Sequence, residues 1–212
     1  MSGRKRLYGG SFDPNARNDP RAIISRWVRE STSVLEVGPG DGVISRYLKH
    51  LKNCHTVGVE VMPEALGVAR DAFHHLIIGD IEDHHTLEQV ARFGPFDSIV
   101  LADVLEHLVD PWAVLRQLRS QLKPSGDVLL SVPNVAHWSI RLSLLGGRFE
   151  YTDGYLMDRS HLRWFTRRSA RDMAKQAGYR ILEEATVYKP HIARFWPSLM
   201  GYQIVLRVAA AE

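Results

Sequence analysis

The chain has 212 residues, of which 45% are hydrophobic and 24% charged, and its formal net charge is +3. This length and composition fit one globular domain and argue against a disordered or fibrous chain. No apolar run approaches the roughly 18 residues of a membrane helix, and no apolar segment follows the basic N-terminus, so we predict neither a membrane span nor a secretory signal. The single cysteine, Cys54, excludes an internal disulfide and fits a cytoplasmic location.

The first elements alternate between strands and helices. Residues 1–17 have no periodicity, so we expect an arm that is mobile or caps the substrate. A helix is expected to begin at Pro20 with Asp19 as its cap. We then expect strands at 33–37, 56–60, 75–78, 97–102 and 127–132, with helices near 43–52, 62–72, 84–92 and 109–121. Such alternation predicts a mainly parallel sheet with helices on both faces.

The last third of the chain departs from this alternation. Residues 133–165 form a long insertion rich in aromatic residues, which we expect to make an acceptor pocket or lid. Thr166 is expected to cap a helix that ends at Gly178. Two further strands are expected near 179–188 and 201–208, antiparallel to each other. Because no repeat or domain boundary is visible, we predict a single domain over 1–212.

A glycine-rich turn joins the first strand to the next helix. Its sequence, Glu36-Val-Gly38-Pro-Gly40-Asp-Gly42, allows positive φ angles and a close approach of a ligand to the backbone. The GxGxG spacing differs from the GxGxxG of dinucleotide sites, and no Gly-Lys-Ser/Thr of a P-loop follows. The carboxylate of Glu36 would repel a pyrophosphate but attract an ammonium group.

Two more carboxylates follow the next strands. Glu60 ends the second strand and can accept hydrogen bonds from ribose hydroxyls, while Asp80 follows the third strand and can accept from the amine of adenine. Each alone is equally compatible with an ordinary surface carboxylate. With Glu36, however, they occupy the carboxyl ends of successive strands, where open parallel sheets bind ligands. Together they predict an adenosine that carries an amino acid, which is S-adenosylmethionine.

These residues resemble the class I methyltransferases over roughly residues 18–188. The glycine turn is similar to their first motif, residues 96–108 (FDSIVLADVLEHL) to the fourth-strand motif of their small-molecule branch, and residues 122–127 to the turn before their fifth strand. The resemblance implies a Rossmann-like, doubly wound sheet of seven strands, mostly parallel with the last strand antiparallel. It also implies a cofactor site formed by Glu36, Gly38, Gly40, Gly42, Glu60, Val61, Asp80, Ile81, Ala102 and Asp103.

Two histidines are candidates for catalysis. Methyl transfer from a sulfonium mainly needs alignment and exclusion of water, and a hydroxyl acceptor gains from a base near neutral pH, which favours histidine. His107 follows the fourth strand, and His161 lies in the insertion expected to cover the same edge. The alternatives are a capping role for His107 and a packed loop position for His161.

A metal site is an alternative use of the same residues. Asp103, Glu106, His107 and His161 offer ligands that can hold Mg²⁺ or Mn²⁺ against a vicinal diol. The set resembles that of the metal-dependent 2′-O-methyltransferases of small-RNA 3′ ends. Their motif has Glu where this chain has Asp103, and this chain lacks their RNA-binding domains.

The insertion also offers candidates for the acceptor pocket. Asn134 ends the fifth strand, and His137, Trp138 and Arg141 follow it. The pocket wall or lid is expected to use the aromatic residues Tyr151, Tyr155, Trp164 and Phe165. Aromatic residues in such a segment are as often a satellite core.

The leading prediction is O-methylation of a hydroxyl on a small molecule or glycan. No Asp/Asn-Pro-Pro-Tyr/Phe follows the fourth strand, which argues against methylation of base amino groups in nucleic acids. Residues 132–142 are also similar to the methyltransferase-like accessory proteins of methionine biosynthesis, which would support a partner acyltransferase. A third alternative is a 2′-O-methyltransferase of RNA. We expect no membrane or nucleic-acid partner and either a monomer or a homodimer.

Overall fold

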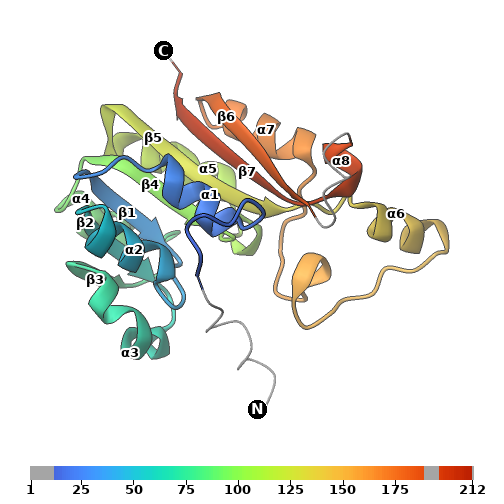
Figure 1. The fold of residues 1–212 in the computed structure, drawn as a ribbon, viewed down its shortest axis with the longest axis horizontal. Helices are drawn as coiled ribbons and strands as arrows, with labels where there is room; N and C mark the ends of the chain where they lie inside the picture. Colours follow the sequence, from blue (N-terminus) through green and yellow to red (C-terminus); the bar gives the residue numbers. More distant parts are fainter. Residues whose placement is uncertain (1–11, 189–195, 212) are drawn as a thin grey trace.

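One seven-stranded sheet organises the molecule (Figure 1). The computed structural model describes residues 12–188 and 196–211. The strands are β1 (Ser33–Val37), β2 (His55–Glu60), β3 (His75–Ile78), β4 (Phe96–Ala102), β5 (Leu122–Pro133), β6 (Tyr179–Tyr188) and β7 (Gly201–Ala210). Their order is β3-β2-β1-β4-β5-β7-β6; β1 to β5 are parallel, and β7 is antiparallel to both β5 and β6. The predicted Rossmann-like sheet with its reversed last strand is confirmed.

Helices cover both faces of this sheet. They are α1 (Pro20–Trp27), α2 (Val43–Leu51), α3 (Leu66–Ala69), α4 (His84–Ala91), α5 (Pro111–Leu118), α6 (Trp138–Leu145), α7 (Arg167–Gln176) and α8 (Pro197–Met200). Ile24 of α1 and Leu48 of α2 join one core cluster, whereas Leu115 of α5 and Met173 of α7 join the other. Burial of these apolar faces on the two sides of the strands is the main stabilising term of the fold.

The predicted helix ends are found where their capping residues stand. The Asp19 carboxylate accepts the N–H of Arg21 at the start of α1. Thr166 and Ser169 form a reciprocal capping box at the start of α7, a contribution of about 1 kcal/mol. Gly178, with φ of +86°, follows the end of α7. These local signals work because each satisfies backbone groups that the helix leaves unpaired.

Three segments differ from the sequence expectation. The helix expected near 62–72 is broken into short 3-10 pieces on either side of α3, and Gly67 inside it weakens a continuous helix. β5 begins at Leu122, five residues early, because Leu122 pairs with Phe96 before a register shift. The insertion contains α6, which has no buried residue and therefore shows no amphipathic periodicity.

The N-terminal arm is described only from residue 12 onward, so the expectation for 1–11 lies outside the described residues. The rest of the arm packs on the body: Arg26 donates to the carbonyls of Pro14 and Ala16 at 2.7 and 3.0 Å, and the Phe12 ring meets Tyr47 edge-on. Over residues 12–188 and 196–211, no helix is long and apolar enough to cross a membrane.

Candidate active site

The glycine turn after β1 has the backbone that its sequence predicts. Gly38, Gly40 and Gly42 have φ angles of +61°, +57° and +70°, which L side chains rarely adopt. A Cβ atom on Gly38 would also lie 2.8 Å from the Val104 side chain. The turn therefore requires glycine for both conformation and space, and it leaves the backbone open to close approach by a ligand.

Glu60 is tied to this turn by hydrogen bonds. Its Oε2 accepts the N–H of Gly40 at 3.2 Å, and its Oε1 accepts the N–H of Met62 at 3.0 Å. The side chain is buried, but each carboxylate oxygen keeps a second lone pair. Glu60 can thus position the turn and still accept hydrogen bonds from two hydroxyls, as the ribose prediction requires. The bond to Gly40 is a role that the sequence did not reveal.

Glu36 lies beneath the turn instead of at the open edge. It is buried, and its Oε2 accepts hydrogen bonds from both the N–H and the hydroxyl of Ser45 in α2. Burial raises the pKa of Glu36 to about 7, with the Asp41 and Glu60 carboxylates adding to the rise. The side chain therefore holds the first turn of α2, and its attraction for a ligand ammonium stays a prediction.

The next strand ends hold the remaining predicted cofactor residues. Asp80 is half-buried, and its Oδ1 accepts the N–H of Glu82 at 2.9 Å. Val61 is 61% exposed, Ala102 is half-buried, and Ile81 belongs to the core. Because β3, β2, β1 and β4 are neighbours and parallel, their carboxyl ends share one edge of the sheet. A ligand that extends from the glycine turn across this edge would reach Glu60 first and then Asp80.

Asp103 is fixed to the neighbouring strands. Its φ is +56°, its Oδ1 accepts from the Ser131 hydroxyl at 2.7 Å, and its Oδ2 accepts from the Gln203 amide at 2.7 Å. Burial raises the pKa of the Asp103 carboxyl. Both oxygens are therefore engaged with β5 and β7, while the nearby charge of His107 opposes the rise of the Asp103 pKa.

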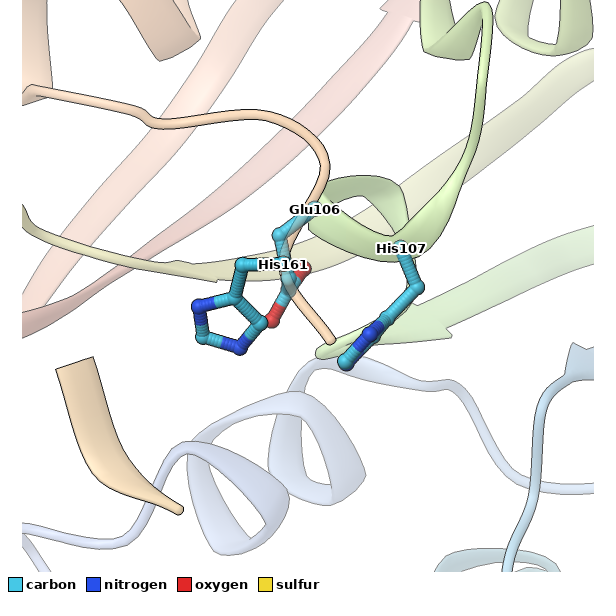
Figure 2. A group of neighbouring side chains, drawn as sticks. All are labelled: Glu106, His107 and His161. Atoms are coloured by element: carbon cyan, nitrogen blue, oxygen red, sulfur yellow. The ribbon is translucent and has the colours of Figure 1, made fainter. Parts of the chain in front are cut away.

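His107 and His161 meet next to the end of β4 (Figure 2). Their ring centroids are 4.9 Å apart, and the rings are edge to face. The contact persists because the insertion is fastened to the 3-10 helix 105–107: the carbonyl of Glu106 accepts the N–H groups of Leu162 and Arg163 at 2.8 and 3.0 Å. Burial, followed by the neighbouring His107, lowers the pKa of His161. The lowered pKa favours the neutral form of the His161 ring, which can accept a proton.

Glu106 completes a cluster with the two histidines. One potential ligand atom from each of Glu106, His107 and His161 lies within 4.8 Å of the others. Glu106 is 1% exposed, and its Oε2 has no hydrogen-bond partner. Burial, together with the Asp103 carboxylate, raises the pKa of Glu106 well above its usual range. Of the four predicted metal ligands, three come together, and Asp103 does not join them.

A hollow of about 430 Å³ opens beside His161. It is lined by Tyr151, Arg159, His161 and Leu162. The Trp164 ring meets the His161 ring at a centroid distance of 5.5 Å and also contacts Phe149 and Tyr151. The insertion therefore places an aromatic wall next to the histidine pair. A separate hollow of about 610 Å³ flanks the edge strand β3 and takes no part in this arrangement.

Several residues expected in the acceptor pocket are structural instead. Asn134 is fully buried, and its amide donates to the carbonyls of Ser198 and Gly201. His137 is also fully buried, caps α6 and stacks on Tyr202 at a centroid distance of 4.2 Å. Phe165 lies in the core. A sequence window cannot separate a polar residue that faces a pocket from one that ties two strands together.

Arg21 is a further candidate near this site. It begins α1, is half-buried, and pairs with Asp19 at 2.8 Å. The hydrogen bond that Arg21 donates to the Asp19 carboxylate raises the pKa of Arg21, and the charges of Asp41 and Asp103 add to the rise. A guanidinium therefore stands close to both the glycine turn and the end of β4. Only the packing of α1 across the sheet reveals this position.

Comparison with known proteins identifies the family. Residues 12–184 match the family model described as "Methyltransferase domain", and the chain belongs to the S-adenosylmethionine-dependent methyltransferases. Its cofactor is S-adenosylmethionine. The fit to this cofactor rests on the glycine turn, on the free lone pairs of Glu60 and on the shared strand edge.

Curated relatives carry a more particular name. The chain is 32% identical over 131 residues to a "Ubiquinone biosynthesis O-methyltransferase" of Xanthomonas axonopodis pv. citri, covering 60% of this chain and 54% of that protein. It is 28% identical over 151 residues to a protein of the same name from Dechloromonas aromatica, covering 65% and 64%. The aligned part of the chain thus spans about half the length of the first of these relatives.

Solved structures share the fold at low identity. The CcbJ methyltransferase of Streptomyces caelestis has a TM-score of 0.62 at 17% identity, covering 96% of this chain and 94% of that one. The 1,6-didemethyltoxoflavin-N1-methyltransferase of Burkholderia thailandensis, with bound S-adenosylhomocysteine, has a TM-score of 0.61 at 15% identity, covering 92% and 80%. The [4+2]-cyclase SpnF is also similar, with a TM-score of 0.62 at 14% identity, covering 95% and 86%. The fold alone therefore does not define the acceptor.

Proposed function

We propose that this methyltransferase transfers the methyl group to a hydroxyl oxygen of a small molecule or glycan. The observation that carries the proposal is the meeting of His107 and His161 at the carboxyl end of β4, beside a hollow that Tyr151 and Leu162 help to line. A neutral imidazole at this place suits removal of a hydroxyl proton. The curated relatives, named as O-methyltransferases, support the same chemistry.

The cofactor is proposed to lie across the shared edge of β1 to β4. The glycine turn would approach its amino-acid part, the Glu60 carboxylate would accept from its ribose hydroxyls, and Asp80 would accept from its adenine amine. Arg21 stands near the turn and would bind the cofactor carboxylate. Val61, now exposed, would be covered by the adenosine.

Catalysis then needs alignment and one proton acceptor. The cofactor supplies an electrophilic methyl group. The wall of Trp164 and Tyr151 would hold the acceptor against His161, so that its hydroxyl faces the edge where the glycine turn ends. His161 would receive the hydroxyl proton, and the exposed ring of His107 would pass it to solvent.

Methyl transfer to a defined panel tests the proposal. The purified chain would be incubated with methyl-labelled S-adenosylmethionine and with hydroxyl acceptors, each paired with the matching amine. We expect label in methyl ethers, and turnover of His161→Ala reduced by about 100-fold, the lower range for loss of a general base. The exposed His84 offers a matched control, and His84→Ala should keep full activity. Label found only in methylamines would contradict the proposal.

A second candidate is an accessory protein on the same fold. The helix α6 has no buried residue, and Trp138, Leu142 and Leu145 on it are 45%, 60% and 85% exposed. An apolar surface of this kind suits contact with a partner protein. The hollow beside His161 instead favours a catalytic function over the accessory role. If the whole panel stays unlabelled while the cofactor binds, the accessory role becomes the better explanation.

An RNA acceptor has less support. Of the basic residues next to His161, Arg159 pairs with Asp153 at 2.8 Å, and Arg163 donates to the Val109 carbonyl. Binding of an RNA end needs cations that are available to phosphates. We therefore do not extend the proposal to RNA.

A further inference from the structure

The cluster of Glu106, His107 and His161 has a geometry that a proton relay alone does not need. Two of its members are adjacent on the 3-10 helix 105–107, and the third reaches them from the insertion (Figure 2). One donor atom from each lies within 4.8 Å of the others. Three such donors within this span, two of them imidazoles, match the ligand types of a mononuclear metal site with open positions.

The burial of Glu106 points to a cation. Its Oε2 is without a hydrogen-bond partner although the side chain is 1% exposed. A buried carboxylate without a partner is costly, and its electrostatic neighbour Asp103 is another acid. A bound cation would satisfy the unpaired oxygen and offset the repulsion between the two acids.

The tautomer of His107 also suits a ligand. Its Nδ1 lies 3.2 Å from the carbonyl oxygen of Ser160. Because a carbonyl can only accept, Nδ1 must donate, and in the neutral ring this leaves Nε2 with a free lone pair. Metal-binding histidines are commonly oriented by such a bond to a backbone carbonyl. Ser160 directly precedes His161, so one loop orients one ligand and supplies another.

We propose that Glu106, His107 and His161 bind one divalent first-row transition metal, Mn²⁺ or a similar ion, and that its open positions take two neighbouring oxygens of the acceptor. Two imidazoles favour such an ion over Mg²⁺, which prefers oxygen ligands. Three protein ligands leave coordination positions open, whereas in a structural zinc site protein ligands fill all positions.

This inference rests on the proposed O-methylation, replaces the proton transfer through His161 and His107 with metal-assisted loss of the proton, and narrows the acceptor to a vicinal diol or catechol. The methyl group leaves sulfur and bonds to one acceptor oxygen, the hydroxyl proton passes to water, and the products are a methyl ether and S-adenosylhomocysteine. The metal favours loss of that proton. The two histidines would then act as ligands instead of bases, and Asp103, held by Ser131 and Gln203, would stay outside the set.

Binding of Mn²⁺ alone, without cofactor or acceptor, tests the site. The full chain would be freed of metal by chelation and titrated with Mn²⁺ under electron paramagnetic resonance. We expect saturable binding of one ion per chain, weakened by at least about tenfold in His107→Gln, His161→Gln and Glu106→Gln. His107 is exposed, so its variant should fold even if the buried Glu106 variant does not. The control His84→Gln should bind as the wild type does.

Two outcomes would overturn the inference: no saturable binding of Mn²⁺, or binding that is unchanged in His107→Gln and His161→Gln. A separate titration with S-adenosylmethionine keeps the proposed function distinguishable, because the cofactor should bind whether or not metal is present. Methylation of a catechol that survives EDTA would likewise contradict the metal while leaving O-methylation in place. Loss of activity in EDTA, restored by Mn²⁺ for a catechol but absent for the matching single phenol, would support it.

Discussion

The cofactor side and the acceptor side of this enzyme are built in different ways. The cofactor side consists of strand ends and a glycine turn whose backbone is fixed by buried strands, and Glu60 ties the turn to β2. The proposed acceptor side is the insertion 133–165, in which every residue from 141 to 150 is exposed. Two hydrogen bonds to the Glu106 carbonyl, together with the buried residues Asn134, His137 and Phe165, hold it against the body.

We expect from this difference that cofactor binding and acceptor binding can be changed separately. Substitutions in the turn should reduce cofactor binding with little need to touch the insertion. Substitutions in the insertion should change the acceptor and leave cofactor affinity intact. A substitution on one side that changes binding at the other would show that the two sides are coupled.

The largest effect is expected at Gly38. In Gly38→Val the new side chain is strained by the left-handed backbone and clashes with Val104, and each of these two effects costs on the order of 1–3 kcal/mol. The affinity for S-adenosylhomocysteine, measured by calorimetry, should therefore fall by about 100-fold. The helical Gly67 has no atom within 4 Å of an added Cβ, and Gly67→Ala is the matched control. Wild-type affinity in Gly38→Val would mean that the turn does not contact the ligand.

The next effect concerns stability and pH. The pKa of Glu36 is about 7 in the folded state, above the usual 4.5, so its protonated form is favoured by folding. The corresponding stability is complete below about pH 4.5 and is lost as the pH rises to 7, a difference of about 3 kcal/mol. Urea unfolding of Glu36→Gln should lack this loss. If the variant and the wild type show parallel pH profiles, the buried carboxyl is not the cause.

Glu60 should give a smaller and more specific effect. Loss of the ribose hydrogen bonds in Glu60→Ala should weaken the binding of S-adenosylhomocysteine by roughly tenfold, or about 1.4 kcal/mol. Because Glu60 also holds Gly40, a second ligand is needed to separate the two roles. The 2′-deoxy analogue should bind the wild type more weakly than the parent ligand does. Its affinity should fall less than that of the parent ligand when Glu60 is replaced by alanine. Equal losses for both ligands would assign Glu60 to the turn alone.

Arg21 should contribute least among the cofactor residues. It is half-exposed, so Arg21→Ala is expected to weaken S-adenosylhomocysteine by about fivefold at most. Binding of 5′-methylthioadenosine, which lacks the carboxylate, should not change. Arg26→Ala, on the same helix but bonded to Pro14 and Ala16, is the control. Equal weakening of both ligands would place the guanidinium elsewhere.

The acceptor side should leave cofactor affinity untouched. Tyr151→Ala removes one wall of the hollow beside His161 and should raise the KM for a catechol several-fold. Calorimetry with S-adenosylhomocysteine should give the wild-type value. A fall in cofactor affinity equal to the rise in KM would break the separation between the two sides.

The sequence predicted the glycine turn, the helix caps and the buried strands well, because their signals are local. A glycine in the left-handed region, a cap such as Thr166 and a run of buried strand residues each act through neighbouring atoms. The acceptor side depends on contacts across distant parts of the chain. The meeting of His107 with His161, 54 positions later, was only a hypothesis until the loop was seen bonded to Glu106.

Other features were hidden for the same reason. His137 and Asn134 looked like pocket residues, although both tie β5 to later segments of the chain. The role of Arg21 arises from α1 packing across the sheet, and no pattern around it marks the position. The helix α6 has no buried side, so hydrophobic periodicity could not predict it.

A crystal structure with S-adenosylhomocysteine and a catechol would show whether the cofactor and the acceptor meet at the histidine pair. We predict that the ribose hydroxyls bond to Glu60, that the adenine lies at Asp80, and that the sulfur faces the acceptor oxygen beside His107 and His161. A ligand seated at this edge with its sulfur turned away from the histidine pair would contradict the account.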